Sequence, residues 1–218
     1  VALGQGAQAS GDSSFASGLA STASGPFSTA MGNGAEASGD NSIAIGKDTT
    51  ASGFSSTAIG NDAIASNFYS TAIGHITQAT GSSSTALGTS SQASGDFSTA
   101  IGYGTQANAS TSTAMGGFTI ASGDYSTATG AYTTASGTGA FSIGYQSIAA
   151  GNYSFAGGGL SDVPTPGGHA IGDNSIAFGL DAISNDASFA LGNGTKAGVD
   201  AGGLATGSGA VAVGNNTN

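Results

Sequence analysis

The sequence predicts an all-β fold: a parallel β-roll (solenoid) of 14-residue coils, with two short strands per coil. Two glycine series, and the alternation of side chains between them, lead to this prediction. The first series recurs every 14 residues, at Gly4, Gly18, Gly32, Gly46, Gly60, Gly74, Gly88, Gly102, Gly116, Gly130, Gly144, Gly158 and Gly172. The second lies seven residues out of phase, at Gly11, Gly25, Gly39, Gly53, Gly81, Gly95, Gly123, Gly137 and Gly151, and lapses to Asn67 and Ala109. A fixed short period is the signature of a stacked repeat.

The two series divide each coil into two halves of seven residues, and we expect a turn glycine to close each half. Asp96–Gly102 is typical of the first half, the Ser half, and Tyr103–Asn108 of the second, the Ala half. Alternation and enrichment in Thr and Ile favour short strands. Helix is disfavoured because each glycine costs about 1 kcal/mol relative to alanine. Asn67 fits the turn, since asparagine tolerates a positive φ, whereas Ala109 fits less well.

Alternation also assigns faces to the two halves. In the Ser half, Ser98 and Ala100 lie on one face of the strand. Thr99 and Ile101 lie on the other. The Ala half can bury only a face of small residues, typified by Ala51. We therefore expect the small faces of both halves to meet inside the coil, with the larger side chains of the Ser half pointing outward.

The outward-pointing side chains form an apolar row along the coils. Its members are Leu3, Met31, Ile45, Ile59, Ile73, Leu87, Ile101, Met115, Ile143 and Ile171. Burying one such side chain stabilises by roughly 1.5–3 kcal/mol. Ten left exposed would forgo on the order of 20 kcal/mol, more than the net stability of a typical domain. We expect a parallel homo-oligomer with cyclic symmetry to bury this trimer-core row in register, although the row alone does not choose between two, three or more chains.

Two segments resemble the head repeat of the YadA-like trimeric autotransporter adhesins. The residues that carry the resemblance are Asn41, Ser42, Ile43, Ala44, Ile45, Gly46 and Asn174, Ser175, Ile176, Ala177, Phe178, Gly179. The surrounding pattern, Ser-x-Ala-Ile-Gly followed by x-x-Ala-x-Ala-x-Gly, covers nearly the whole chain. The resemblance implies a left-handed β-roll assembled as a parallel homotrimer, at the tip of a fibre anchored in the outer membrane of a Gram-negative bacterium. It also implies binding of host matrix proteins or other surfaces.

The repeat suggests a single domain over residues 1–218. We expect regular coils over 1–158, an irregular loop over 159–168, resumed coils over 169–192 and degraded repeats over 193–218. Prolines in the loop cannot donate ladder hydrogen bonds. We expect one Ala half to be lost there and two Ser halves to follow, ending at Gly172 and Gly179. The loop is either a tolerated irregularity or a ligand contact. Because the chain begins at Val1 in the middle of a motif, we expect it to be a piece of a longer protein.

Composition argues against several classes of function. The formal net charge is -10, and only Lys47 and Lys196 could neutralise phosphates, which disfavours nucleic acid and anionic membranes. Without cysteine there are no disulfides and no thiolate metal sites. His75 and His169 are far apart in the chain, and no set of nucleophile, base and orienting residue is present. We therefore expect no enzyme activity, no cofactor and no metal.

Acidic residues follow several second-series glycines, at Asp12, Asp40, Asp96 and Asp124. The closest lie two coils apart, roughly 9.6 Å at strand spacing. One calcium ion needs oxygens at about 2.3–2.6 Å. The pattern therefore indicates a solvated acidic edge and not a calcium site.

Five aromatic residues share one turn position, mostly in every second coil: Phe27, Tyr69, Phe97, Tyr125 and Tyr153. They either pack against neighbouring turns or form an aromatic stripe that binds a matrix protein or a glycan. Leu160 and Val163, in the expected loop, complete this candidate ligand surface.

These observations favour a non-enzymatic cell-surface adhesin head. Its expected partners are its own copies and an extracellular matrix protein, a host cell or an abiotic surface, with a membrane attached only through an anchor outside this sequence. One alternative is the structural shaft of a phage-like or secreted trimeric fibre without its own ligand site. Another is a flat threonine array that binds ice or another crystalline surface.

Overall fold

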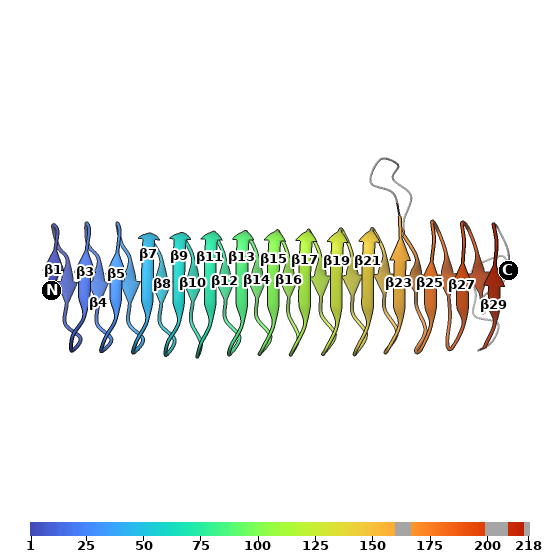
Figure 1. The fold of residues 1–218 in the computed structure, drawn as a ribbon, viewed down its shortest axis with the longest axis horizontal. Coiled ribbons are helices and arrows are strands. Elements are labelled where there is room, and N and C mark those ends of the chain that lie inside the picture. Colours follow the sequence, from blue (N-terminus) through green and yellow to red (C-terminus); the bar gives the residue numbers. More distant parts are fainter. Residues whose placement is uncertain (160–166, 199–208, 216–218) are drawn as a thin grey trace. The chain divides into compact units, whose positions relative to one another are not determined.

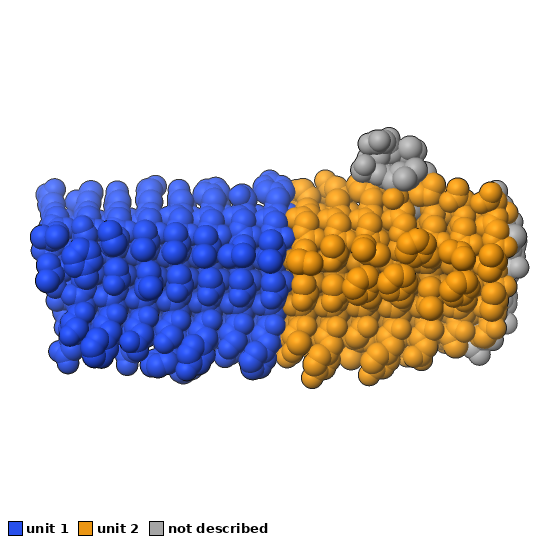
Figure 2. Space-filling model, in the orientation of Figure 1, with its two compact units in different colours: residues 1–105 blue, residues 106–218 orange. Residues whose placement is uncertain are grey.

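The structure of the chain is a computed structural model that describes residues 1–159, 167–198 and 209–215. The chain forms two compact units, residues 1–105 and 106–218, which are coloured separately in Figure 2. Strands and turns make up the described residues, with no helix among them. The predicted all-β fold is therefore confirmed.

Each unit contains two parallel sheets, here named sheet A (odd-numbered strands) and sheet B (even-numbered strands), whose strands alternate along the chain (Figure 1). In the first unit, sheet A comprises β1 (Ala2–Leu3), β3 (Phe15–Ser17), β5 (Thr29–Met31), β7 (Ile43–Lys47), β9 (Thr57–Asn61), β11 (Thr71–His75), β13 (Thr85–Thr89) and β15 (Thr99–Tyr103). Its sheet B comprises β2 (Gln8–Ala9), β4 (Thr22–Ala23), β6 (Glu36–Ala37), β8 (Thr50–Ala51), β10 (Ile64–Ala65), β12 (Gln78–Ala79) and β14 (Gln92–Ala93).

The second unit repeats this arrangement. Its sheet A comprises β17 (Thr113–Gly117), β19 (Thr127–Ala131), β21 (Phe141–Tyr145), β23 (Phe155–Gly158), β25 (Ile176–Phe178), β27 (Phe189–Leu191) and β29 (Val211–Val213). Its sheet B comprises β16 (Gln106–Ala107), β18 (Ile120–Ala121), β20 (Thr134–Ala135), β22 (Ile148–Ala149), β24 (His169–Ala170), β26 (Ile183–Ser184) and β28 (Lys196–Ala197). Strands of one sheet pair in parallel with equivalent repeat residues opposite one another, as Ala72 pairs with Ala58 and Ala86. The predicted parallel solenoid with two strands per coil is therefore confirmed.

Small side chains fill the space between the two sheets, as the alternation predicted. The buried apolar side chains in the described ranges are all alanine, and the largest fully buried side chains are threonines such as Thr49 and Thr77. The buried serines of the Ser half have a local role. The hydroxyl of Ser84 donates to the carbonyl of Gly81 at 2.7 Å, and that of Ser154 to Gly151 at 2.6 Å. Serine fits this position because it bonds back to the turn that precedes its own strand.

The first-series glycines do not close turns, so that part of the prediction was wrong. Gly46, Gly60 and Gly74 lie inside β7, β9 and β11, with φ of 132°, 132° and 137°. Side chains rarely adopt such a conformation. A β-carbon at Gly60 would also collide with the carbonyl of Gly74 in the next coil. Glycine recurs every 14 residues because both constraints recur.

The second-series glycines do lie at the turns, but they do not supply the positive φ. In the turn that Gly53 starts, the amide of Ser56 donates to the Gly53 carbonyl at 3.2 Å, and it is Ser55 that has φ of 52°. Glycine is required at 53 because a β-carbon would collide with the backbone of Asn67. The explanation for Asn67 was therefore wrong: its amide donates to the Ser70 hydroxyl at 3.2 Å, and positive φ falls on Tyr69.

The repeat resumes after residue 159 in a register that differs from the prediction. His169 and Ala170 form β24 of sheet B, paired with β22 and β26, so residues 168–172 are an Ala half and no Ala half is lost. Gly158 faces Gly179 and not Gly172, whose coil neighbour is Gly151. The chain between Phe155 and its partner Ile176 is one half-coil longer than the regular 14 residues.

Candidate functional site

The outer face of sheet A in each unit carries the predicted apolar row. Leu3, Met31, Ile73 and Ile101 in the first unit are 37–55% exposed. Ile45, Ile59 and Leu87 are half-buried by their neighbours in the same row. In the second unit, Met115 and Ile143 are each 37% exposed. The interior cannot accept these side chains because alanine, serine and threonine already fill it.

Ile171 does not belong to the apolar row. It follows β24 of sheet B, where its amide donates to the carbonyl of Ser184 at 2.9 Å. Its place in the row is taken by Phe178, the register partner of Gly157. The sequence misled because Gly172 follows Gly158 by one 14-residue period, although the two glycines belong to different series.

Phenylalanines extend the apolar face of sheet A in the second unit. The rings of Phe141 and Phe155 stack with centroids 5.3 Å apart, and Phe155 stacks on Phe178 at 6.0 Å. Gly157 makes room for this stack, because a β-carbon there would collide with the Phe178 ring. This face is therefore apolar well beyond the isoleucine positions that the sequence singled out.

The five aromatic residues of the turns share one conformation and are strongly exposed. Phe27, Tyr69, Phe97, Tyr125 and Tyr153 have φ of 54–59° and are 59–68% exposed. Contacts with neighbouring turns are partial. The Tyr69 ring meets Phe54 edge-on at 5.6 Å, and the Tyr153 ring lies over Gly139. Leu160 and Val163, the other two residues of the candidate ligand surface, lie outside the described residues.

A second column of turn residues, which the sequence did not reveal, has the same left-handed conformation. It follows sheet A and includes Asp48, Asp62, Ile76, Phe118 and Tyr132, with φ of 51–57°. The signal in the sequence is weak because side chains of many types occupy the position. A bulky or β-branched residue at positive φ is strained, so Ile76 and Tyr132 are unusual occupants.

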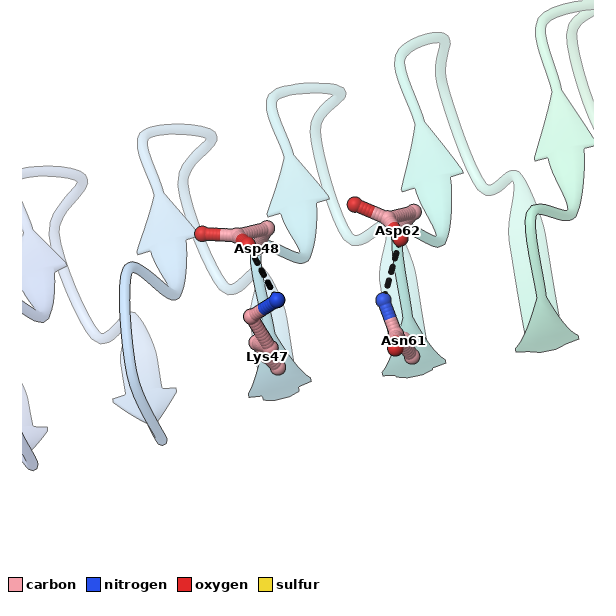
Figure 3. Close-up of polar contacts among 4 residues, drawn as sticks. All are labelled: Lys47, Asp48, Asn61 and Asp62. Atoms are coloured by element: carbon pink, nitrogen blue, oxygen red, sulfur yellow. Dashed lines mark hydrogen bonds and ion pairs between the residues drawn. The ribbon is translucent and has the colours of Figure 1, made fainter.

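The acidic members of this second column pair with the residue before them (Figure 3). Lys47 and Asp48 form an ion pair of 3.5 Å, and the Asn61 amide donates to the Asp62 carboxylate. Both groups of the ion pair are largely exposed, so its contribution to stability is small. These contacts order the turns locally and leave the carboxylates facing solvent.

The acidic residues that follow second-series glycines link neighbouring coils. The Asp96 carboxylate accepts a hydrogen bond from the amide of Ser82 at 2.8 Å, and Asp124 accepts from Ser110 at 3.1 Å. Each donor is the equivalent residue of the preceding coil. Aspartate thus satisfies a turn amide, a structural role that periodicity alone did not disclose.

No described part of the chain assembles a metal-binding or membrane-spanning feature. His75 and His169 lie in different units, and no three His, Asp or Glu side chains in the described ranges are grouped to hold a metal ion. Burial lowers the pKa of the His169 imidazole from its ordinary value, while the charge of Asp181 opposes this shift. Among the described residues, no helix is long and apolar enough to cross a membrane.

A parallel β-solenoid with an interior of small residues, an apolar outer face and exposed aromatic turns defines a class of repeat proteins built to present surfaces. The model of the YadA head domain repeat matches residues 1–22, 23–49, 51–75, 79–105, 107–133, 135–161 and 170–195. The chain therefore belongs to the YadA head family, and the resemblance seen in the sequence is confirmed. No curated protein matches the chain significantly.

Proposed function

We propose that the chain is the non-enzymatic head of a homotrimeric surface adhesin. The family indicates a surface adhesin role. In this proposal the head lies outside the cell, on a fibre anchored in the outer membrane of a Gram-negative bacterium. It needs no cofactor or metal, and it attaches to extracellular matrix proteins, host cells or abiotic surfaces.

The single observation that carries the proposal is the exposed apolar row of sheet A. Within each unit the row is continuous over several coils, and the same residues recur in register. A contiguous apolar surface of this length marks an interface. A parallel trimer about a common axis buries the row against two copies of itself, with every coil at the same height.

Attachment uses the surface that this trimer leaves open. The aromatic turns at Tyr69, Phe97 and Tyr125 precede sheet A and are about two-thirds exposed. Aromatic side chains are enriched at the centres of protein interfaces, because they bury a large area with little loss of rotamer entropy. We place the contact with a surface-bound partner along these turns.

The proposal is tested in two measurements. Light scattering of the purified chain should give a concentration-independent mass near three times 20.4 kDa. Beads coated with the trimer should then adhere to collagen-coated, fibronectin-coated or bare polystyrene surfaces more than beads coated with albumin. A folded monomer would contradict the trimer. A trimer that adheres to none of these surfaces would instead favour a structural shaft without its own ligand site.

A further inference from the structure

A hollow on the second unit lies in the corner between the second turn column and the outer face of sheet B. Its volume is about 330 Å³, and it is lined by Tyr132, Thr134, Gln146, Ile148 and His169. Tyr132 and Gln146 are consecutive members of the turn column. Thr134, Ile148 and His169 are register partners on β20, β22 and β24. Small-molecule sites have volumes of about 300–1,000 Å³, so the hollow suits one small ligand.

One face of the Tyr132 ring is already occupied and the other is turned toward the hollow. Phe118, one coil earlier, stacks on Tyr132 with centroids 5.2 Å apart and planes 13° from parallel. Tyr145 meets the same ring edge-on at 5.9 Å. Gln146 and His169 lie on the coils that follow, beyond the opposite face of the ring. Tyr132 is therefore a platform held from behind.

The hollow opens where the repeat is interrupted. On the coil of His169, the turn column is approached by Gly159 and Gly167, which carry no side chain. A β-carbon at either glycine would press on the carbonyl of Tyr145. On the regular coils this place holds a side chain such as Gln146. The described residues thus leave this corner open above the imidazole of His169.

The polar groups of the hollow each both donate and accept hydrogen bonds. The Thr134 hydroxyl and the Gln146 amide always do so. The His169 imidazole does so in its neutral form, and burial favours that form by lowering the His169 pKa. No carboxylate lines the hollow, and the formal net charge of -10 disfavours an anionic ligand.

We propose that this hollow binds a single pyranose ring of a neutral glycan, stacked on Tyr132 and hydrogen-bonded to Thr134, Gln146 and His169. The C–H face of a pyranose is apolar and its rim carries hydroxyls, each of which is both donor and acceptor. An aromatic platform beside three groups of matching dual character fits that chemistry. A metal ion would need more ligands than one imidazole, and a purely apolar ligand would leave the polar groups unpaired.

The first unit contains the same corner without the platform. There, a hollow of about 140 Å³ is lined by Ile76, Gln78, Ser90, Ser91 and Gln92, which stand at the repeat positions of Tyr132, Thr134, Gln146, Ser147 and Ile148. Because this hollow is smaller and has no aromatic ring, we expect it not to bind the sugar. It serves as an internal negative site.

The proposal deepens the adhesin function and rests on it for its biological role, yet it is tested without any attachment assay. The probes are the methyl glycosides of glucose, galactose and mannose, with that of glucuronic acid as the acidic comparator. In ¹H saturation-transfer NMR on the whole chain near pH 8, at least one neutral glycoside should receive saturation on its ring protons. The chain has only two histidines, so the imidazole resonances of His169 should shift and those of His75 should not.

Variants that the repeat itself accepts complete the experiment. Tyr132→Ser places at 132 the residue that Ser90 provides in the same conformation, and should weaken binding about tenfold. His169→Gln introduces the residue found at the equivalent Gln78 and should weaken binding severalfold. Tyr103→Thr removes an equally exposed ring outside the hollow, follows its register partner Thr89, and should leave binding unchanged.

The outcomes that overturn the proposal are distinct from those that overturn the adhesin function. Absence of saturation transfer to all three neutral glycosides, binding that survives Tyr132→Ser, or tighter binding of the glucuronide would each reject the sugar site. None of these results bears on the mass of the assembly or on bead adhesion. Conversely, beads that fail to adhere would reject the adhesin function, while the NMR titration would still report on the hollow.

Discussion

A β-carbon has no place at the first-series positions, and this restricts the sequence more tightly than any other feature of the repeat. Gly60 combines a φ of 132° with close contact to the Gly74 carbonyl of the next coil. Gly117, in β17, lies in neither situation: its φ is not positive, and a β-carbon there would meet nothing within 4 Å. Its register partner is already an alanine, Ala131.

Gly60→Ala should therefore destabilise the chain, whereas Gly117→Ala should not. Strain from a positive φ and overpacking against the next coil together suggest a loss of about 2–5 kcal/mol for Gly60→Ala. Gly117→Ala should be neutral or stabilising by about 0.5 kcal/mol, since it reduces the freedom of the unfolded chain. Urea unfolding followed by circular dichroism measures both. Equal effects would mean that glycine at 60 is not required by the backbone.

His169 should make stability depend on pH in a known direction. Burial lowers its pKa in the folded chain, with Asp181 acting against the shift, so the unfolded chain binds more protons as pH falls. The stability that His169 contributes is present above the ordinary histidine pKa of about 6.5 and is lost as pH falls through that value toward the lower folded pKa. Urea unfolding at fixed protein concentration should show a decline between about pH 7.5 and 5. His169→Gln should flatten it, and an unchanged slope would contradict the assignment.

At the scale of the strand and turn, the sequence predicted some features correctly and misplaced others. Alternation alone placed Ala100 inside and Ile101 outside, because a strand has only two faces. Periodicity could not say which residue of a turn takes positive φ, and the structure gives that role to Ser55 and not to Gly53. The corner beside Tyr132 was also out of reach, since it depends on residues from three coils.

The interruption after Gly159 offers a test of the register. Removing residues 160–166 would join Gly159 to Gly167 and align Gly158, His169 and Ala170 with Gly144, Ile148 and Ala149. We expect this deletion to fold with a melting temperature within a few degrees of the parent, because it restores the 14-residue coil. Thermal circular dichroism measures it.

A deletion of equal length inside the regular coils provides the control. Removing residues 61–67 takes away β10 and its turn, so sheet B would lose its continuity between β8 and β12. This variant should melt far lower or fail to fold. If the 160–166 deletion behaved in the same way, the pairing of β24 with sheet B would be wrong.

At the scale of the whole molecule, the small interior forces the question of partners. An interior of alanine, serine and threonine gives each coil little apolar area of its own, while isoleucine, leucine and methionine stay on the outer face of sheet A. In ordinary domains these larger side chains supply the core. Here the stabilisation they could provide becomes available only when chains associate, so folding and assembly should be coupled and the melting temperature should rise with protein concentration.

Charges placed on that face should separate assembly from mere surface change. Ile59→Asp and Ile101→Asp each bury a carboxylate in the proposed trimer interface, where an unpaired charge is strongly disfavoured. We expect light scattering to show masses well below three times 20.4 kDa, together with a lower melting temperature. Gln92→Asp makes a comparable change on the outer face of sheet B, where Gln92 contacts Gln78 through a 3.4 Å hydrogen bond. It should assemble like the parent, because that face stays in water. If all three variants assembled alike, sheet A would not be the interface, and the apolar row would need another partner.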